Sequence, residues 1–404
     1  MTIAALNTFE ARNRNLAEVL EAIRDAPGRS RSEIHADMPF SLQTMTNVVQ
    51  ELVDLGLVGE TEKRRPGHRG SPHRGLHITA GGCHVLGLQM RWNACASALV
   101  DLNLDVIVRQ TKNLRAPVED DEAYIAELEQ TIGGLLEQHS HRRIWALAVS
   151  APLPIHERGA QQPLVPPQGN QWDDQRWFRS FWSRFSIESL RGRLQRTFGL
   201  PVLIQNNPQS AAMAEAMRLP RSARLVFLFA GLGFGAAFVG GRALNRDIWR
   251  HGGEIGHVVY RKRPLSSVLS ASGVRMAPNL TQPQGTFEAE LERLVTERPD
   301  LFEPWLEEAE PVLRFLVNFL ENAIWPDGIA LGGFLPNALI DRLLARVQLD
   351  DSMVQPDSPE RSIARLFRAR NAIEAIPAGV ASTALSFRAN PDFPALIGLH
   401  RNRD

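Results

Sequence analysis

A glycine-rich turn followed by a carboxylate and an imidazole is the stretch of this sequence best suited to chemistry. The glycines occur at Gly231, Gly233 and Gly235, between two apolar runs, and Glu254-Ile-Gly-His257 follows them. Glycines let the backbone approach a ligand closely, because no Cβ lies in the way. Glu254 and His257 are three residues apart, so both side chains can point into one pocket. Two apolar runs around a glycine loop predict a strand, a tight turn and a second strand.

A second polar cluster follows another apolar run. The run 200–204 predicts a strand, which runs into the polar segment 205–210 and then into a helix. This segment contains Asn206 and Asn207, two side chains that can both donate and accept hydrogen bonds.

Aromatic residues are concentrated in 168–185, where three tryptophans lie near Asn170. Rings beside amides and carboxylates suit sugar pockets, because ring faces stack on the C–H patches of a pyranose. Asn170 and Trp172 are therefore pocket candidates. The alternative is an amphipathic segment that buries Trp177, Phe178 and Phe181 against the protein.

The first 60 residues have the helix order of a helix-turn-helix. Apolar residues at helical spacing predict a helix over 15–24, and Ser30 with Glu33 has the form of a capping box that starts a short helix. Ser41 is the expected N-cap of the next helix, which ends at Gly56. In such motifs the N-terminal residues of the last helix contact base edges. The candidates here are polar and uncharged: Ser41, Gln43, Thr44, Thr46 and Asn47.

Two short predicted strands, at 57–58 and 76–78, enclose a loop with five basic residues. Basic side chains on a loop of this kind, rich in glycine and proline, suit contacts with phosphates or with a narrow minor groove. The alternative is a solvated basic loop on a protein-binding winged helix. Because the head as a whole has balanced charge, a dimer would be needed for tight and specific DNA binding. The basic residues of this predicted wing are Lys63, Arg64, Arg65, Arg69 and Arg74.

Length and composition indicate an ordinary globular protein with more than one domain. The chain has 404 residues, of which 44% are hydrophobic and 22% charged. Lys plus Arg and Asp plus Glu both number 45, so net charge indicates no partner. Two cysteines without metal or redox spacing predict no disulfide, which fits a reducing cytoplasm. The uncharged run 225–241 carries five glycines, which favours buried strands over a membrane helix.

The segment from 85 to 151 predicts strands at 85–89, 94–101, 106–110 and 143–151, with a helix at 121–139. The first hairpin turn, which follows Gln89, contains Arg91 but no carboxylate and no glycine pair. Arg91 is expected at the surface of this turn; the alternative is that it meets an anion. Later segments predict a helix at 313–323, a strand from 328 that leads into Gly332 and Gly333, and a solvated basic face at 361–370.

In their order along the chain, these segments resemble the ROK family (repressors, open reading frames and kinases). The resemblance covers nearly the whole chain: the winged helix-turn-helix, the first hairpin, and the segments 199–215, 228–241, 252–260, 324–343 and 376–387. It implies an α/β fold, with an N-terminal winged helix-turn-helix followed by a two-lobed, actin-like (ribonuclease-H-like) sugar-kinase fold. The expected boundaries are 1–80 for the DNA-binding domain, 81–200 for the first lobe and 201–404 for the second lobe, whose last helix (about 371–388) packs back on the first lobe.

The resemblance implies a sugar pocket that has lost its catalytic groups. In the family's kinases an Asn-Asp pair follows the strand at 200–204, and the Asp deprotonates the sugar hydroxyl. Here the pair is Asn206-Asn207, and an amide cannot accept that proton. The family's metal carboxylate and phosphate-binding hydroxyl are replaced by Gln89 and Leu232, and no catalytic residue is expected. The nucleotide-facing Gly332-Gly333 is kept.

The family's Glu and His that hold sugar hydroxyls match Glu254 and His257. In the family this His also binds zinc, together with a cysteine-rich loop. The corresponding loop at 261–272 contains no cysteine, so neither a metal nor a cofactor is expected. The predicted ligand-binding residues are Asn170, Asn206, Asn207, Glu254 and His257.

These features favour a cytoplasmic, DNA-binding transcriptional regulator, a repressor that senses a sugar or sugar derivative without turning it over. It is expected to bind double-stranded operator DNA as a homodimer or tetramer, with no membrane partner. One alternative is a regulator that responds to a non-sugar ligand or to a protein partner. The other is an active sugar kinase, which the joint loss of base, metal carboxylate and phosphate hydroxyl disfavours.

Overall fold

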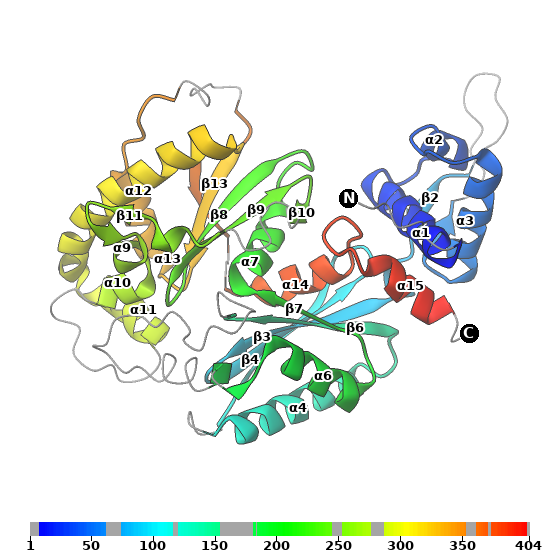
Figure 1. The fold of residues 1–404 in the computed structure, drawn as a ribbon, viewed down its shortest axis with the longest axis horizontal. Helices are drawn as coiled ribbons and strands as arrows, with labels where there is room; N and C mark the ends of the chain where they lie inside the picture. The colour runs from blue at the N-terminus through cyan, green and yellow to red at the C-terminus, as the bar shows by residue number, and fades with distance from the viewer. Residues whose placement is uncertain are drawn as a thin grey trace.

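The head of the protein is a winged helix-turn-helix (Figure 1). The structure, a computed structural model, describes residues 8–61, 74–115, 120–153, 181–182, 184–244, 253–275, 287–352, 361–370 and 373–401. The elements of the head are α1 (Thr8–Asp25), α2 (Arg31–His35), α3 (Leu42–Asp54), β1 (Val58–Glu60) and β2 (Leu76–Ile78). β1 and β2 pair antiparallel. The predicted helix-turn-helix order is confirmed, although α1 begins well before the predicted start at residue 15.

The predicted capping residues start α2 and α3. The carboxylate of Glu33 accepts the backbone N–H of Ser30 at 2.7 Å, and the Ser30 hydroxyl accepts the N–H of Glu33, which completes the capping box. The Ser41 hydroxyl accepts the N–H of Thr44 at 3.2 Å. The apolar side of α3 is buried, through Met45, Val48, Val49 and Leu52. This burial fixes which side of α3 faces away from the protein.

The first lobe is a five-stranded mixed sheet in the order β5-β4-β3-β6-β7. Its strands are β3 (His84–Arg91), β4 (Ala94–Asp101), β5 (Val106–Asn113), β6 (Ile144–Ala151) and β7 (Val202–Asn206). One face packs against α4 (Asp121–Gln138) and α6 (Ile187–Phe198) (Figure 1). Because β7 pairs with β6, this sheet extends past residue 200, where the sequence suggested a boundary.

The second lobe is another five-stranded sheet, in the order β10-β9-β8-β13-β14. Its strands are β8 (Arg224–Ala230), β9 (Phe234–Gly240), β10 (Ala243–Leu244), β13 (Gly328–Gly333) and β14 (Leu366–Arg368). The uncharged run 225–241 is therefore a β-hairpin, as predicted. One face packs against α9 (Ser266–Leu269), α10 (Ala271–Arg275), α11 (Phe287–Glu297), α12 (Glu303–Ile324) and α13 (Asn337–Arg346). In the part of the chain that the structure describes, no helix has the length and apolar character needed to cross a bilayer.

Two helices connect the lobes at the centre of the molecule (Figure 1). α7 (Asn207–Ala216) packs on β8 and β9 of the second lobe. α14 (Ile376–Ala384) packs on β3, β4 and β6 of the first lobe, and against α7. The approach is very close, because a Cβ at Gly87 of β3 would lie 1.9 Å from the carbonyl oxygen of Pro377. A Cβ at Gly379 would lie equally close to the carbonyl oxygen of Ser210.

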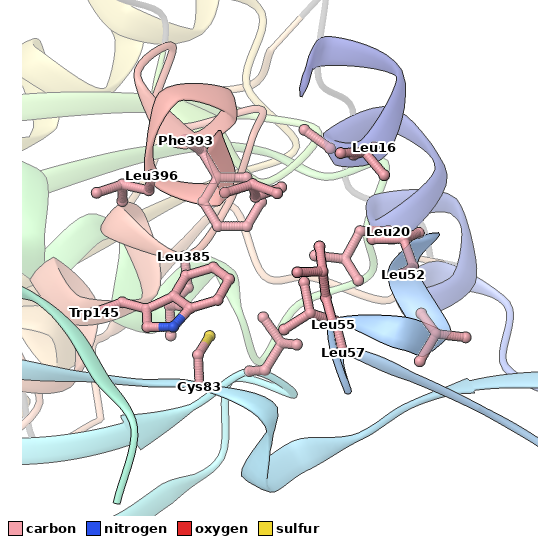
Figure 2. Close-up of a cluster of buried hydrophobic side chains, with 14 of the residues drawn as sticks. Leu16, Leu20, Leu52, Leu55, Leu57, Cys83, Trp145, Leu385, Phe393 and Leu396 are labelled. Carbon is pink, nitrogen blue, oxygen red and sulfur yellow. The ribbon is translucent and has the colours of Figure 1, made fainter. Parts of the chain in front are cut away.

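A further helix, α15 (Phe393–Arg401), follows α14 and was not predicted from the sequence. It packs against α1 of the head and against β6. Figure 2 shows the resulting cluster, in which Leu16 and Leu20 of α1 share one core with Trp145 and with Phe393 and Leu396 of α15. The head is therefore joined to the first lobe through a continuous apolar core.

Residues 80–82, at the expected boundary between the head and the first lobe, lie within this packed junction. They form a 3₁₀ turn, η1 (Ala80–Gly82), and Gly82 is buried. A Cβ at Gly82 would lie 2.5 Å from the carbonyl oxygen of Gly56, so only glycine fits there without movement of the backbone. Next to it, burial raises the pKa of the Cys83 thiol far above its usual range, which keeps the thiol protonated and unreactive.

The prediction of a solvated basic face at 361–370 is wrong for its central residue. Arg365 is 5% exposed and makes two hydrogen bonds of 2.7 and 2.8 Å to the carboxylate of Glu321 on α12. The segment continues as β14, which pairs parallel with β13. Sequence periodicity could not reveal this, because the partner carboxylate lies 44 residues away in the chain.

Candidate functional site

The N-terminal half of α3 presents its polar side chains outward. Gln43 and Asn47 are exposed and hydrogen-bonded to each other at 3.1 Å, one helical turn apart. Thr46 is half-buried and donates to the carbonyl of Leu42 at 2.9 Å, while Ser41 and Thr44 are engaged in the helix cap. Gln43 and Asn47 are therefore the groups of the predicted set best placed to contact a base edge.

One candidate on this surface was missed from the sequence. Leu42, the first residue of α3, is 53% exposed beside Gln43. An exposed leucine at this position could contact the methyl group of a thymine in the major groove. The signal was available, because Leu42 does not belong to the apolar stripe that Met45, Val48 and Val49 define.

Arg74 alone represents the predicted basic wing in the described part of the chain. Its guanidinium is bonded at 2.7 Å to Glu60 of β1, which also accepts from Arg31 at 2.6 Å. The hydrogen bond from Arg74 is the main reason why the pKa of Glu60 lies below its usual value. Arg74 thus closes the base of the wing. The remaining predicted wing residues, Lys63, Arg64, Arg65 and Arg69, lie outside the described residues, as does Asn170.

In the region of the predicted pocket, β7 runs directly into α7 within the polar segment 205–210. Asn206 ends β7 and caps α7, with its side-chain oxygen accepting the N–H of Gln209 at 2.9 Å. Asn207 is the first residue of α7 and is 4% exposed. Its side-chain oxygen accepts a hydrogen bond of 2.8 Å from the hydroxyl of Ser150 on β6. Ser150 is a further polar group of this site that the sequence did not single out.

The Glu254–His257 segment approaches the start of α7 across the glycine hairpin. A Cβ at Gly235 of β9 would lie 3.5 Å from the carbonyl oxygen of Gly253 and 3.7 Å from the ring of Pro208. Gly235 therefore lies between Gly253, which precedes Glu254, and Pro208, which follows Asn207. Glu254 and His257 are both exposed; Glu254 directly precedes the turn η2 (Ile255–His257), and His257 is its last residue. The fold thus brings the two predicted halves of the pocket to the same region, and the Glu254 and His257 side chains remain accessible.

The first hairpin turn contacts the second lobe, and Arg91, predicted at the surface, is only partly exposed. Arg91 is half-buried, and its guanidinium carbon lies 5.8 Å from the ring centroid of Phe334. Phe334 follows Gly333 of β13 directly and packs edge-on against Phe229. A cation–π contact therefore connects the two lobes beside the Gly332-Gly333 turn.

The loop at 261–272 is stabilised by apolar packing and hydrogen bonds. Leu265, Val268 and Leu269 are buried in the core of the second lobe. The indole N–H of Trp305 on α12 donates to the carbonyl of Val268 at 2.8 Å. Within the described ranges, no cluster of His, Cys, Asp or Glu side chains is arranged to hold a metal ion.

Comparison with curated proteins finds two informative relatives, although no protein-family model matches the chain. The DNA-binding transcriptional repressor Mlc of Escherichia coli is 24% identical over 190 residues, which is 46% of this chain and 43% of Mlc. The alignment thus spans less than half of the repressor. The uncharacterized protein y4fQ of Sinorhizobium fredii is 24% identical over 351 residues, which is 82% of this chain and 81% of that protein.

Solved structures share the fold. A ROK-family transcriptional regulator, a homolog of the Escherichia coli MLC protein, matches with a TM-score of 0.67 and 17% identity over 98% of this chain and 100% of its own. A ROK hexokinase from Thermus thermophilus matches with a TM-score of 0.51 and 21% identity over 74% of this chain and 96% of its own. The predicted fold class is confirmed: a winged helix-turn-helix followed by a two-lobed sugar-kinase fold. The chain is similar in sequence to the repressor Mlc and in fold to an Mlc-like transcriptional regulator of the ROK family.

Proposed function

We propose that this protein is a transcriptional repressor that senses a sugar or sugar derivative in a kinase-like pocket without phosphorylating it. The observation that carries the proposal is the environment of Asn207. By the sequence resemblance, its buried amide takes the position of the general base of ROK kinases, and its oxygen accepts a hydrogen bond from the Ser150 hydroxyl. An amide cannot take up the proton of a sugar hydroxyl, whereas it can hold that hydroxyl by hydrogen bonds.

DNA binding is assigned to α3 and to the wing. Similarity to the repressor Mlc supports this part of the proposal. Deleting the head would be a poor test, because Leu16 and Leu20 belong to a core shared with the first lobe. The better variant is Gln43→Ala with Asn47→Ala, which changes only exposed side chains. We expect it to weaken binding to DNA from the gene's own promoter region at least tenfold, measured by fluorescence anisotropy at fixed salt.

The control for this experiment is Gln50→Ala, because Gln50 lies further along the exposed side of α3. It should bind the same DNA within about threefold of the wild type, because base contacts concentrate at the start of the helix. Unchanged binding by the double variant would mean that α3 is not the recognition helix.

The sensor part is tested by thermal-shift screening with hexoses, N-acetylhexosamines and their 6-phosphates. A compound that binds only the folded protein raises its melting temperature by mass action. Glu254→Ala should abolish the shift, since Glu254 is exposed beside the proposed pocket and can hold hydroxyls. A coupled assay with ATP and the same compounds should show no turnover. Clear turnover would refute the non-catalytic assignment, and a screen without any shift would favour a non-sugar ligand or a protein partner.

The proposed assembly is a homodimer formed through an aromatic face of the second lobe. This face contains Phe315 and Phe319 of α12, which are 36% and 46% exposed, and Tyr260 of β11 (Val259–Tyr260), which stacks on Phe315 at 4.7 Å. The exposed turn at 261–263 is basic, whereas Glu307 and Glu308 near the start of α12 are exposed acids. Arg263 of this turn pairs with Glu308 of its own chain. A second copy related by a two-fold axis could place Arg261 and Lys262 of one subunit against Glu307 of the other, so the surface is self-complementary.

A further inference from the structure

A row of polar side chains crosses three neighbouring strands of the first-lobe sheet. Gln89 of β3 is in register with Ser150 of β6, and Ser150 is in register with Gln205 of β7. Residues in register across a sheet point to the same face, so the three side chains lie side by side. We refer to Gln89, Ser150 and Gln205 as the polar row. All three are buried, with exposed fractions of 0%, 0% and 2%.

The polar row faces the junction between the lobes. Gly87, two residues before Gln89 and therefore on the same face, lies in contact with the backbone of α14 at Pro377. Ser150 reaches Asn207 at the start of α7, the helix that packs on the second lobe. Gln89 thus follows the α14 contact at Gly87 by two residues along β3. The row also lies next to Asn207, in the region of the proposed pocket.

Two members of the row have partners, and the third does not. The Ser150 hydroxyl donates to Asn207, and the Gln205 amide donates to the Ser210 hydroxyl at 3.3 Å. In contrast, within the described part of the chain neither the oxygen nor the nitrogen of the Gln89 side-chain amide has a hydrogen-bond partner. A buried donor and acceptor left without partners destabilise the folded state, and such exceptions in proteins require an explanation.

We infer that Gln89 binds the effector, and that it recognises an uncharged part of the ligand that carries neighbouring hydroxyl groups or an acetamido group. This inference rests on the proposed sensor function. A primary amide presents an N–H donor beside a C=O acceptor, so its complement is a ligand group that offers an acceptor beside a donor. Vicinal hydroxyls and an N-acetyl group both have this arrangement.

The surroundings of Gln89 favour a neutral ligand group over a phosphate. The polar row and Asn207 carry no charge, so a phosphate would lose water there without gaining a cation from these residues. The next cation along β3 on the same face is Arg91, which stacks over Phe334. Gln89 thus replaces a metal-binding carboxylate of the family's kinases with a group suited to hydroxyls.

The test compares Gln89→Met with Gln205→Met in the full-length protein. Methionine has nearly the volume of glutamine and no strong hydrogen-bonding group. Without ligand, Gln89→Met should melt about 1–3 °C higher than the wild type, because it removes unpartnered polar atoms. Gln205→Met should melt lower, because it removes the hydrogen bond that the Gln205 amide donates to Ser210. A lower melting temperature for Gln89→Met would overturn the inference.

The ligand arm uses glucose, N-acetylglucosamine and their 6-phosphates with the same variants, by thermal shift and calorimetry. Gln89→Met should weaken binding of the neutral sugar at least tenfold, and Gln89→Asn, which keeps the amide but shortens the side chain, should also weaken it. If Gln89→Met and Gln89→Asn both bind the neutral sugar with wild-type affinity, the role of Gln89 is overturned. In that case, a sugar-induced thermal shift that Glu254→Ala abolishes would show that the sensor function still stands. If only the 6-phosphates bind, the neutral-ligand assignment is wrong. If none of the four compounds shifts the wild type, the sugar-sensor proposal fails and this inference fails with it.

Discussion

The carboxylate of Asp25, near the end of α1, helps to hold the head against the two lobes. It forms ion pairs with Arg221, which lies between α7 and β8, and with Arg388, which lies between α14 and α15. Glu21, Arg24 and Arg242 are the other charged groups close to it. Burial is the largest influence and raises the pKa of Asp25 from 3.8 to about 6, although the arginines oppose this shift. The head is thus tied to both lobes through a carboxylate that titrates in an accessible range.

The raised pKa of Asp25 predicts a pH dependence of stability. Because the folded state binds the proton more tightly than the unfolded state, the free energy of unfolding should fall as pH rises from about 4 to 6, and stay lowered above 6. Asn at this position removes the charge, so Asp25→Asn should flatten this dependence and stabilise the protein at pH 7 by roughly 1–2 kcal/mol.

Urea unfolding at several pH values measures this effect. The control is Asp37→Asn, because the Asp37 side chain is 61% exposed. Its free energy of unfolding should differ from the wild-type value by only a few tenths of a kcal/mol. An Asp25→Asn variant that is less stable than the wild type at pH 7 would mean that the ion pairs outweigh the cost of burial.

At the scale of elements, the position of α14 depends on two glycines that leave no space for a side chain. Gly87→Ala would place a Cβ 1.9 Å from the carbonyl oxygen of Pro377, so β3 or α14 must move. We expect a loss of roughly 3 kcal/mol or more in the free energy of unfolding, from overpacking against backbone. Because α14 also contacts α7, the variant should weaken any sugar-induced thermal shift as well.

Gly134→Ala is the matched control for this substitution. Gly134 is an exposed residue within α4, and a Cβ there would have no atom within 4 Å. Alanine is a better helix former than glycine, so this variant should be more stable than the wild type by about 0.5–1 kcal/mol. Chemical unfolding of the two variants side by side separates the effect of the close contact from the general effect of replacing glycine.

At the scale of the whole molecule, the head cannot move as a free body without breaking a core. α1, the first-lobe sheet and α15 share one apolar cluster (Figure 2). Arg24 of α1 also donates to the carbonyl oxygens of Leu102 and Leu385, and Glu21 accepts the N–H of Phe387. A movement of α14 and its following segment would therefore reach the head directly. This gives the proposed ligand response a physical route to DNA affinity, provided that the two states bind DNA differently.

The proposed dimer leads to a prediction about assembly. Phe315→Glu with Phe319→Glu would place two charges at the centre of the aromatic face, where a second copy would have to desolvate them. The variant should be monomeric by sedimentation velocity and should bind a palindromic operator at least tenfold more weakly. Leu399→Glu, which changes an exposed leucine on α15, should leave the assembly state unchanged. A double variant that keeps the wild-type mass in solution would exclude this face as the interface.

The sequence by itself determined the local elements and the types of residue available to the site. Capping at Ser30 and Ser41, the apolar stripe of α3 and the glycine hairpin at 231–235 depend on contacts a few residues apart, so their patterns could be recognised along the chain. The replacement of carboxylate by amide at Asn207 could be recognised in the same way, because it concerns the chemistry of one residue at one position of a motif.

Only the tertiary structure decided which of these groups meet. Arg24 and Leu385 are 361 residues apart in the chain, and Arg365 and Glu321 are 44 apart, so no local pattern indicates either contact. For the same reason the burial of Arg365, the packing of α15 on α1 and the stacking of Arg91 on Phe334 could not be predicted. The unpartnered amide of Gln89 belongs with them, because whether a buried polar group has a partner depends on neighbours that the fold supplies.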